Sequence, residues 1–203
     1  MKCRRRLLET LLLLVFVAGC GSNEPGSLTP GSTILAFGDS LTVGVGAGPG
    51  ESYPDVLAEL TGLEVINAGI SGETSEQGRR RLPGVLDDTN PDVLILLEGG
   101  NDILRNRSPA KIKTDLAAMI ETAQDRGITV VFLGVPRKNL FSDSAPLYEE
   151  LAAEFDVIFA EDLLADLLRS PSLKADPIHL NARGYAEMAE AIKSLMAAQG
   201  LIG

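Results

Sequence analysis

Histidine is almost absent from this chain: among 203 residues, His179 carries the only imidazole. This scarcity excludes metal sites built from several histidines, and the scattered carboxylates form no recognisable ligand pattern. Any proton transfer by an imidazole must therefore use His179. A lone histidine is more often structural than catalytic. Asp176, three residues earlier, could orient the ring, which makes the pair a candidate half of a nucleophile–base–orienter relay.

Cysteine is equally scarce. Only Cys3 and Cys20 occur, so we expect no disulfide and no cysteine metal site in the folded domain. Both lie in a leader-like start, where a basic segment precedes an apolar stretch over 11–18 that is too short to span a bilayer, which needs about 20 residues. The stretch ends in Val-Ala-Gly-Cys, which resembles a bacterial lipoprotein signal whose cysteine becomes the lipidated first residue. The alternative is an ordinary secretory signal with an incidental cysteine.

Three segments follow from this interpretation. We expect a signal peptide over 1–19, the lipidated Cys20 with a flexible tether over 20–31, and one folded domain over 32–203. The protein would then reside in the cell envelope, lipid-anchored to a bacterial membrane and facing the periplasm or the exterior.

Basic residues are in deficit, with 18 Lys+Arg against 28 Asp+Glu. Loss of the signal would leave 14 basic and 27 acidic residues, a formal charge of −13. This large negative charge argues against nucleic acid as a partner and against electrostatic attraction of the protein to anionic lipid. We expect a monomer whose contact with the membrane is the anchor at Cys20.

Strictly alternating strand patterns are absent, and short, nearly continuous aliphatic runs take their place. Such runs are typical of strands buried on both faces, and they cover 33–37, 64–67, 92–97, 129–135 and 157–160. Helical patterns cover 53–60, 74–86, 109–126, 145–155 and 182–198. The alternation predicts an α/β fold, a three-layer α/β/α sandwich with a five-stranded parallel sheet. Pro83-Gly84 should kink or break the second helix.

Sites in such sheets form beyond the carboxyl ends of the strands. Gly-Asp-Ser follows the first run, and Ser40 is either a nucleophile or the N-cap of the next helix. Asn-Ala-Gly-Ile-Ser-Gly follows the second run from position 67, and Gly-Gly-Asn-Asp follows the third from position 99. Backbone N–H groups at glycine turns and an amide side chain are donors suited to a developing oxyanion.

These blocks, in this order, resemble the SGNH hydrolases, also called the GDSL esterase/lipase family. The family name gives one residue from each of four blocks, and the chain matches with Ser40, Gly69, Asn101 and His179. The resemblance covers 32–203 and is closest to the branch of bacterial thioesterase I/lysophospholipase L1 and arylesterases. It implies the flavodoxin-like strand order 2-1-3-4-5.

The resemblance also implies roles for these residues. Ser40 would be the nucleophile, His179 the base and Asp176 the residue that orients it. The N–H groups of Ser40 and Gly69, with the Asn101 amide, would form the oxyanion hole. The chain would be a serine esterase without cofactor or metal, hydrolysing small short- to medium-chain acyl, aryl or thioesters through an acyl-enzyme. A carbohydrate O-acetylesterase of the same fold and a non-catalytic lipoprotein binding module are the alternatives.

Some residues remain ambiguous. Ser71 is a second possible nucleophile in a glycine-flanked turn. Glu98 stands where this branch favours an apolar residue, and Arg105 could hold either the substrate or a loop. The segment 137–145 could form part of an acyl groove.

Overall fold

The computed structural model describes residues 27–138 and 143–203. The predicted signal peptide, Cys20 and most of the predicted tether lie outside the described residues, as does the middle of the 137–145 segment.

Five parallel strands form one sheet in the order β2-β1-β3-β4-β5, which confirms the predicted fold class and strand order. The strands are β1 (Thr33–Gly38), β2 (Glu64–Gly69), β3 (Val93–Leu97), β4 (Thr129–Leu133) and β5 (Ile158–Ala160). Gly38, the last residue of β1, pairs with Gly69 of β2 and Leu97 of β3. The carboxyl ends of the three strands therefore meet at one edge, where their following loops can form a site.

The centre of the sheet explains the unbroken aliphatic runs. All five residues of β3 are buried, and β1 is buried from Ile34 onward, because helices cover both faces. The edge strand β2 is more open, with Glu64 and Asn67 exposed.

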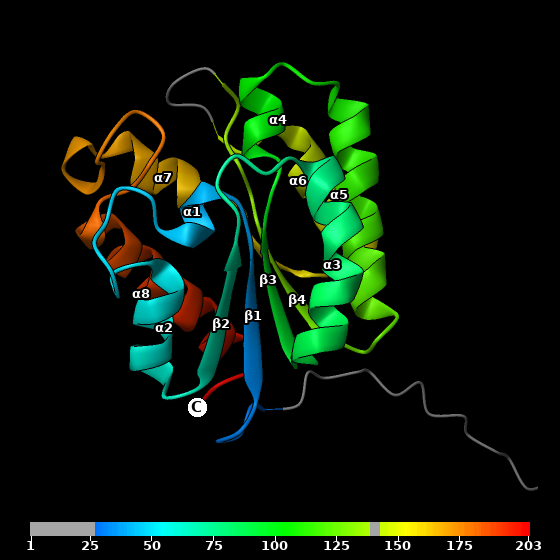
Figure 1. Cartoon of the computed structure of the whole chain (residues 1–203), viewed down its shortest axis with the longest axis vertical. Coiled ribbons are helices and arrows are strands. Elements are labelled where there is room, and N and C mark those ends of the chain that lie inside the picture. Colours follow the sequence, from blue (N-terminus) through cyan, green and yellow to red (C-terminus); the bar gives the residue numbers. More distant parts are fainter. Residues whose placement is uncertain (1–26, 139–142) are drawn as a thin grey trace, which may run out of the picture.

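The helices are α1 (Ser40–Val43), α2 (Tyr53–Thr61), α3 (Ser75–Thr89), α4 (Gly100–Leu104), α5 (Pro109–Gln124), α6 (Pro146–Phe155), α7 (Leu163–Arg169) and α8 (Ala182–Ala198), with a 3-10 turn at Pro171–Leu173. Figure 1 shows a layer of helices on each side of the sheet. Helices α2 and α8 pack together with α1 and α7 on one side of the sheet, and α3, α4, α5 and α6 lie on the other.

Pro83-Gly84 was expected to kink or break the second predicted helix, and the break is wrong. Helix α3 continues to Thr89 with Pro83 inside it. A proline removes one backbone donor and crowds the preceding turn, but packing supports the helix. Leu82 and Leu86 are buried on its inner face, while Gly84 points to open space.

Three short helices, α1, α4 and α7, lie outside the helical patterns predicted from the sequence. With four to seven residues each, they are too short to show helical periodicity. Two of them, α1 and α4, follow directly after β1 and β3 and carry the residues of the site below. Across the two described stretches, none of the helices has the length and apolarity needed to cross a bilayer.

Candidate active site

Ser40 is the first residue of α1, immediately beyond the carboxyl end of β1. The helix N-cap is Asp39, whose side chain accepts the Leu41 N–H at 3.0 Å. The alternative interpretation of Ser40 as the N-cap is therefore wrong, and its hydroxyl is free for another partner. That partner is His179: its Nε2 atom lies 3.0 Å from the Ser40 Oγ.

The loop before α8 holds the imidazole in place. One carboxylate oxygen of Asp176, Oδ1, accepts the N–H groups of Ile178 and His179, each at 2.8 Å. This closes a tight turn that brings the second oxygen, Oδ2, to 2.7 Å from His179 Nδ1. The structure thus brings Ser40, His179 and Asp176 into one hydrogen-bonded line, although Ser40 and His179 are 139 residues apart.

The charge state of Asp176 suits this arrangement. Burial alone would raise the pKa of its carboxyl, but hydrogen bonds from the His179 ring and from the Ile178 and His179 N–H groups outweigh that effect and lower the pKa. The carboxylate therefore stays ionised, accepts the Nδ1–H and leaves the Nε2 lone pair facing the Ser40 hydroxyl.

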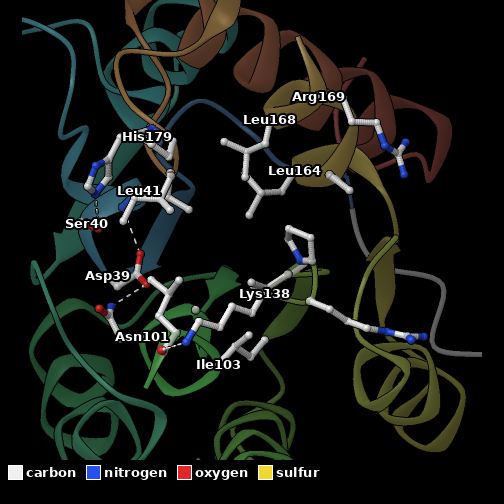
Figure 2. Close-up of a pocket in the computed structure, with 18 residues that line it drawn as sticks. Asp39, Ser40, Leu41, Asn101, Ile103, Lys138, Leu164, Leu168, Arg169 and His179 are labelled. Carbon is white, nitrogen blue, oxygen red and sulfur yellow. Dashed lines mark hydrogen bonds between the residues drawn. The ribbon is translucent and has the colours of Figure 1, made fainter. Parts of the chain in front are cut away.

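Asn101 enters the site from α4. The helix begins after Gly99, whose φ of +97° requires glycine, and a Cβ there would lie 2.5 Å from the Tyr148 hydroxyl. The Asn101 side chain donates from Nδ2 to Asp39 Oδ2 at 3.0 Å, as Figure 2 shows. Asp39 thus links the nucleophile helix to the Asn101 helix and fixes the orientation of the amide.

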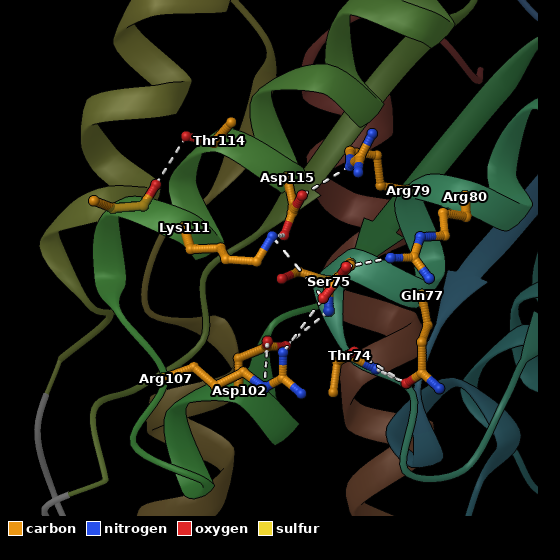
Figure 3. Close-up of polar contacts among 12 residues, drawn as sticks. Thr74, Ser75, Gln77, Arg79, Arg80, Asp102, Arg107, Lys111, Thr114 and Asp115 are labelled. Carbon is orange, nitrogen blue, oxygen red and sulfur yellow. Dashed lines mark hydrogen bonds and ion pairs between the residues drawn. The ribbon is translucent and has the colours of Figure 1, made fainter.

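Asp102, the next residue, ties α4 to α3. It is 1% exposed, and its Oδ2 accepts the Ser75 N–H at the start of α3 at 2.7 Å. Figure 3 shows Arg107 on the other side of this carboxylate, with its Nε 3.6 Å from Oδ1. The acid that follows Asn101 therefore holds the helix that presents it.

Asp39 is itself buried, with 4% exposure. Burial raises the pKa of its carboxyl to about 6, although the Leu41 N–H, the His179 charge and the Asn101 amide each lower it in part. Sequence reasoning missed the role of Asp39 as the residue that orients Asn101. Its place between a strand end and a serine was a usable signal.

The Gly69 N–H has a different role from the one expected. It donates to Asn67 Oδ1 at 3.0 Å, so it is engaged by a side chain of its own strand, β2. A Cβ at this position would lie 2.4 Å from the Val43 N, so glycine is needed for the close approach of β2 to α1. The expectation that the Gly69 N–H forms part of the oxyanion hole is therefore not supported by this hydrogen bond.

Gly72, three residues later, has an N–H with no hydrogen-bond partner among the described residues. Its carbonyl accepts Arg105 Nη2 at 3.2 Å, which ties the loop to the end of α4. Arg105 thus holds a loop, one of its two expected roles. Ser71 in the same turn is exposed, and the imidazole pairs with Ser40 instead.

An apolar cleft opens beside Ser40, and Figure 2 shows Leu164 and Leu168 of α7 facing Ile103 of α4 across it. Leu41, Val135 and Ile178 complete much of its apolar lining. Arg137 and Lys138 also line the cleft, as expected for the start of the 137–145 segment, and Lys138 Nζ donates to the Leu104 carbonyl oxygen at 3.0 Å. Helix α7 is the wall that sequence reasoning missed.

Residues 27–138 and 143–203 contain no cluster of three or more His, Cys, Asp and Glu side chains arranged to hold a metal ion.

The model of the GDSL-like Lipase/Acylhydrolase family matches residues 36–187, a span that runs from the second half of β1 into α8 and includes every residue of the hydrogen-bonded line. The chain belongs to this family. This confirms the resemblance read from the four sequence blocks, and with it the class of ester-hydrolysing enzyme.

Two relatives of this chain carry esterase or thioesterase names, and a third is named a lipoprotein. Esterase TesA of Pseudomonas aeruginosa is 35% identical over 108 residues, which are 51% of this chain and about half, 54%, of that protein. Thioesterase 1/protease 1/lysophospholipase L1 of Escherichia coli is 30% identical over 158 residues, or 73% of this chain and 76% of that protein. An uncharacterized lipoprotein of Bacillus subtilis, YqeF, is 31% identical over 137 residues, or 61% of this chain and 54% of that protein.

Among solved structures, the SGNH-hydrolase family esterase AlinE4 is similar to this chain. The TM-score is 0.66 with 33% identity, and the match covers 85% of this chain and 98% of that one.

Proposed function

We propose that this family member is a serine esterase that hydrolyses short- to medium-chain acyl, aryl or thioesters through an acyl-enzyme on Ser40. One observation carries the proposal: the Ser40 Oγ lies 3.0 Å from His179 Nε2, whose Nδ1 lies 2.7 Å from Asp176 Oδ2. A nucleophile, a base and an ionised residue that orients the base are the three parts that such chemistry needs.

The reaction divides into two steps on this geometry. In the first, Ser40 Oγ attacks the acyl carbon, His179 Nε2 takes the hydroxyl proton, and the proton passes to the departing alcohol or thiol. In the second, water attacks the acyl carbon while His179 Nε2 takes its proton. The bond from the acyl carbon to Ser40 Oγ then breaks, His179 returns the proton to Oγ, and the carboxylic acid leaves. Asp176 keeps the ring in the required tautomer and stabilises the imidazolium between steps.

The oxyanion would be held by donors from three segments, each of which follows a strand. The Asn101 amide keeps one N–H beyond the one it gives to Asp39. The N–H groups of Ser40 and Gly72 have no partner in the described part of the chain, whereas the Gly69 N–H is engaged. We therefore assign the glycine donor to Gly72 in place of Gly69. Each such donor is worth on the order of 10²–10³ in rate.

The cleft favours an acyl substrate. Leucine, isoleucine and valine side chains from α1, α4, α7 and two loops line it, which suits a hydrocarbon chain better than a sugar hydroxyl array. This supports acyl esters over the acetylated carbohydrates that the same fold can accept.

The test is Ser40→Ala against nitrophenyl esters of graded chain length and acetylated sugars, with Ser71→Ala as the matched control. We expect Ser40→Ala to abolish hydrolysis and fluorophosphonate labelling, and Ser71→Ala to retain both. Turnover that survives in folded Ser40→Ala would refute the mechanism. A wild-type preference for acetylated sugars would refute the substrate class, and absence of labelling would favour a binding module.

We also propose that Cys20 is lipidated and anchors the protein in the cell envelope. Support comes from the signal-like start of the chain and from similarity to a protein named a lipoprotein. The Leu28 N–H donates to the Leu201 carbonyl oxygen near the end of the sheet where the strands begin. The folded domain therefore begins at the end of the sheet opposite the one that carries Ser40.

Seven residue steps separate Cys20 from Ser27, and a chain spans at most about 3.6 Å per residue, so this tether reaches roughly 25 Å. A domain of this size is about 40 Å across. The anchored protein would therefore present its site away from its own membrane, towards esters in solution or on a facing surface.

A further inference from the structure

Glu98 is a buried carboxyl that the proposed mechanism does not use. It follows β3 directly and precedes Gly99, the residue that starts the Asn101 helix. Its exposure is 0%. Its Oε2 accepts the Gly99 N–H at 3.1 Å, whereas Oε1 has no hydrogen-bond partner among the described residues.

Among residues 27–138 and 143–203, no Lys, Arg or His side chain forms a hydrogen bond or ion pair with this carboxyl. The titratable groups around it are Asp39 after β1, Glu73 before α3 and Tyr148 of α6, whose hydroxyl donates to the Glu98 carbonyl oxygen at 2.7 Å. Within this cluster Glu73 is paired with Arg81 of α3, whose Nε donates to Glu73 Oε1 at 2.9 Å.

An ionised carboxylate in this place would be buried without a counter-charge and close to two other acids. Burial raises the pKa of Glu98 well above its usual range, and the charges of Asp39 and Glu73 raise it further. The neutral acid matches its surroundings better, because one oxygen accepts the Gly99 N–H and the O–H can point at Glu73.

We propose that Glu98 works in its protonated form as a positioning residue, fixing the Gly99 turn and thereby the Asn101 amide that meets the oxyanion. The inference rests on the proposed function for its effect on activity, although the protonated state does not depend on it. Loss of the proton would add an uncompensated negative charge behind the donors that bind the oxyanion. Hydrolysis should therefore decline at alkaline pH.

The first experiment reads the proton directly. Infrared difference spectra at pH 8 should show the C=O stretch of a protonated carboxylic acid, since Asp39, with its pKa of about 6, is ionised there. We expect this band in the wild type and in the exposed control Glu59→Gln, and its loss in Glu98→Gln. A band that persists in Glu98→Gln, or no band in the wild type, would overturn the proposal.

The second experiment reads the consequence for catalysis. Glu98→Gln keeps a donor and an acceptor, so we expect kcat within about threefold of wild type. Glu98→Ala removes both and should lower kcat by roughly 10- to 10²-fold with little change in KM. The alkaline decline should be present in the wild type and in Glu59→Gln and absent in Glu98→Gln.

Several results would contradict this role. They are an unchanged kcat in Glu98→Ala, an alkaline decline that survives in Glu98→Gln, and a folded wild type with no alkaline decline. If Glu98→Ala does not fold, the glutamine variant and the infrared band decide alone. Residual turnover in Ser40→Ala would refute the esterase mechanism and leave the infrared result standing, so the two failures are distinguishable.

Discussion

The ionised Asp39 carboxylate should lower the free energy of unfolding and support ester hydrolysis, and Asp39→Asn separates these two effects. The carboxyl is 4% exposed, and its pKa rises from an ordinary value of 3.8 to about 6. The folded protein thus binds the Asp39 proton more tightly than the unfolded chain does. The free energy of unfolding must therefore fall as the pH rises through this range and stay lower above it.

The magnitude follows from the two pKa values. At 1.36 kcal/mol per pKa unit, the rise corresponds to about 3 kcal/mol in the limit, of which about 2 kcal/mol appears between pH 4 and pH 8. Asparagine cannot ionise, so the stability of Asp39→Asn relative to wild type should increase by about 2 kcal/mol over that interval. Any constant difference in hydrogen bonding cancels from this comparison.

Activity should change in the opposite direction. Asparagine can still accept the Leu41 N–H, but its amide would face the Asn101 Nδ2 at the position where Asp39 Oδ2 lies 3.0 Å away. Two donors cannot bond, so the Asn101 amide must turn from its present orientation. We expect kcat to fall by up to 10²–10³, the usual effect of losing one oxyanion donor.

Urea denaturation at pH 4 and pH 8 and ester hydrolysis at pH 8 measure the two effects, with the exposed Asp88→Asn as control. The control should change neither quantity. The reasoning is refuted if the stability difference between Asp39→Asn and wild type is independent of pH. It is equally refuted if the variant hydrolyses esters as fast as the wild type.

Two further predictions concern the base and the anchor. Asp176→Asn keeps an oxygen for the Ile178 and His179 N–H groups but favours the wrong tautomer of the His179 ring. On a nitrophenyl ester, kcat should therefore fall by on the order of 10⁴ with little change in KM. A near-normal kcat would contradict the role of Asp176. Cys20→Ala should move the protein from the detergent phase to the aqueous phase in detergent partition, and mass spectrometry should show that its bound fatty acid is lost. Cys3→Ala should change neither result. A Cys20→Ala protein that stays in the detergent phase would contradict the lipid anchor at Cys20.

Much of the fold could be predicted from the sequence because burial on both faces leaves a clear pattern. The run Val93–Leu97 is aliphatic throughout, and the structure makes it the fully buried central strand. The helices α1 and α4 could not be predicted in the same way. Their conformation depends on a capping carboxylate at Asp39 and a left-handed Gly99, which are single-residue signals without periodicity.

The pairing of Ser40 with His179 could be expected from topology, since parallel strands deliver their following loops to one edge. Residues that act through others were harder to find. Asp39 orients Asn101 from a distance of 62 residues in the chain, and Asp102 ties its helix to Ser75. A motif shows that such acids are present, but only coordinates show what each carboxylate contacts.

Gly69 and Gly72 show where a motif stops short of a mechanism. Gly69 ends β2 and Gly72 lies in the turn that follows, and both are needed for local geometry, so residue type cannot tell which N–H faces the substrate. The decision rests on a side chain outside the pair: Asn67 Oδ1 accepts the Gly69 N–H, and Asn67 Nδ2 donates to the Thr42 carbonyl oxygen at 2.8 Å. Asn67 thus clamps β2 to α1 and engages the Gly69 N–H, which is why the proposed mechanism takes Gly72 as the glycine donor.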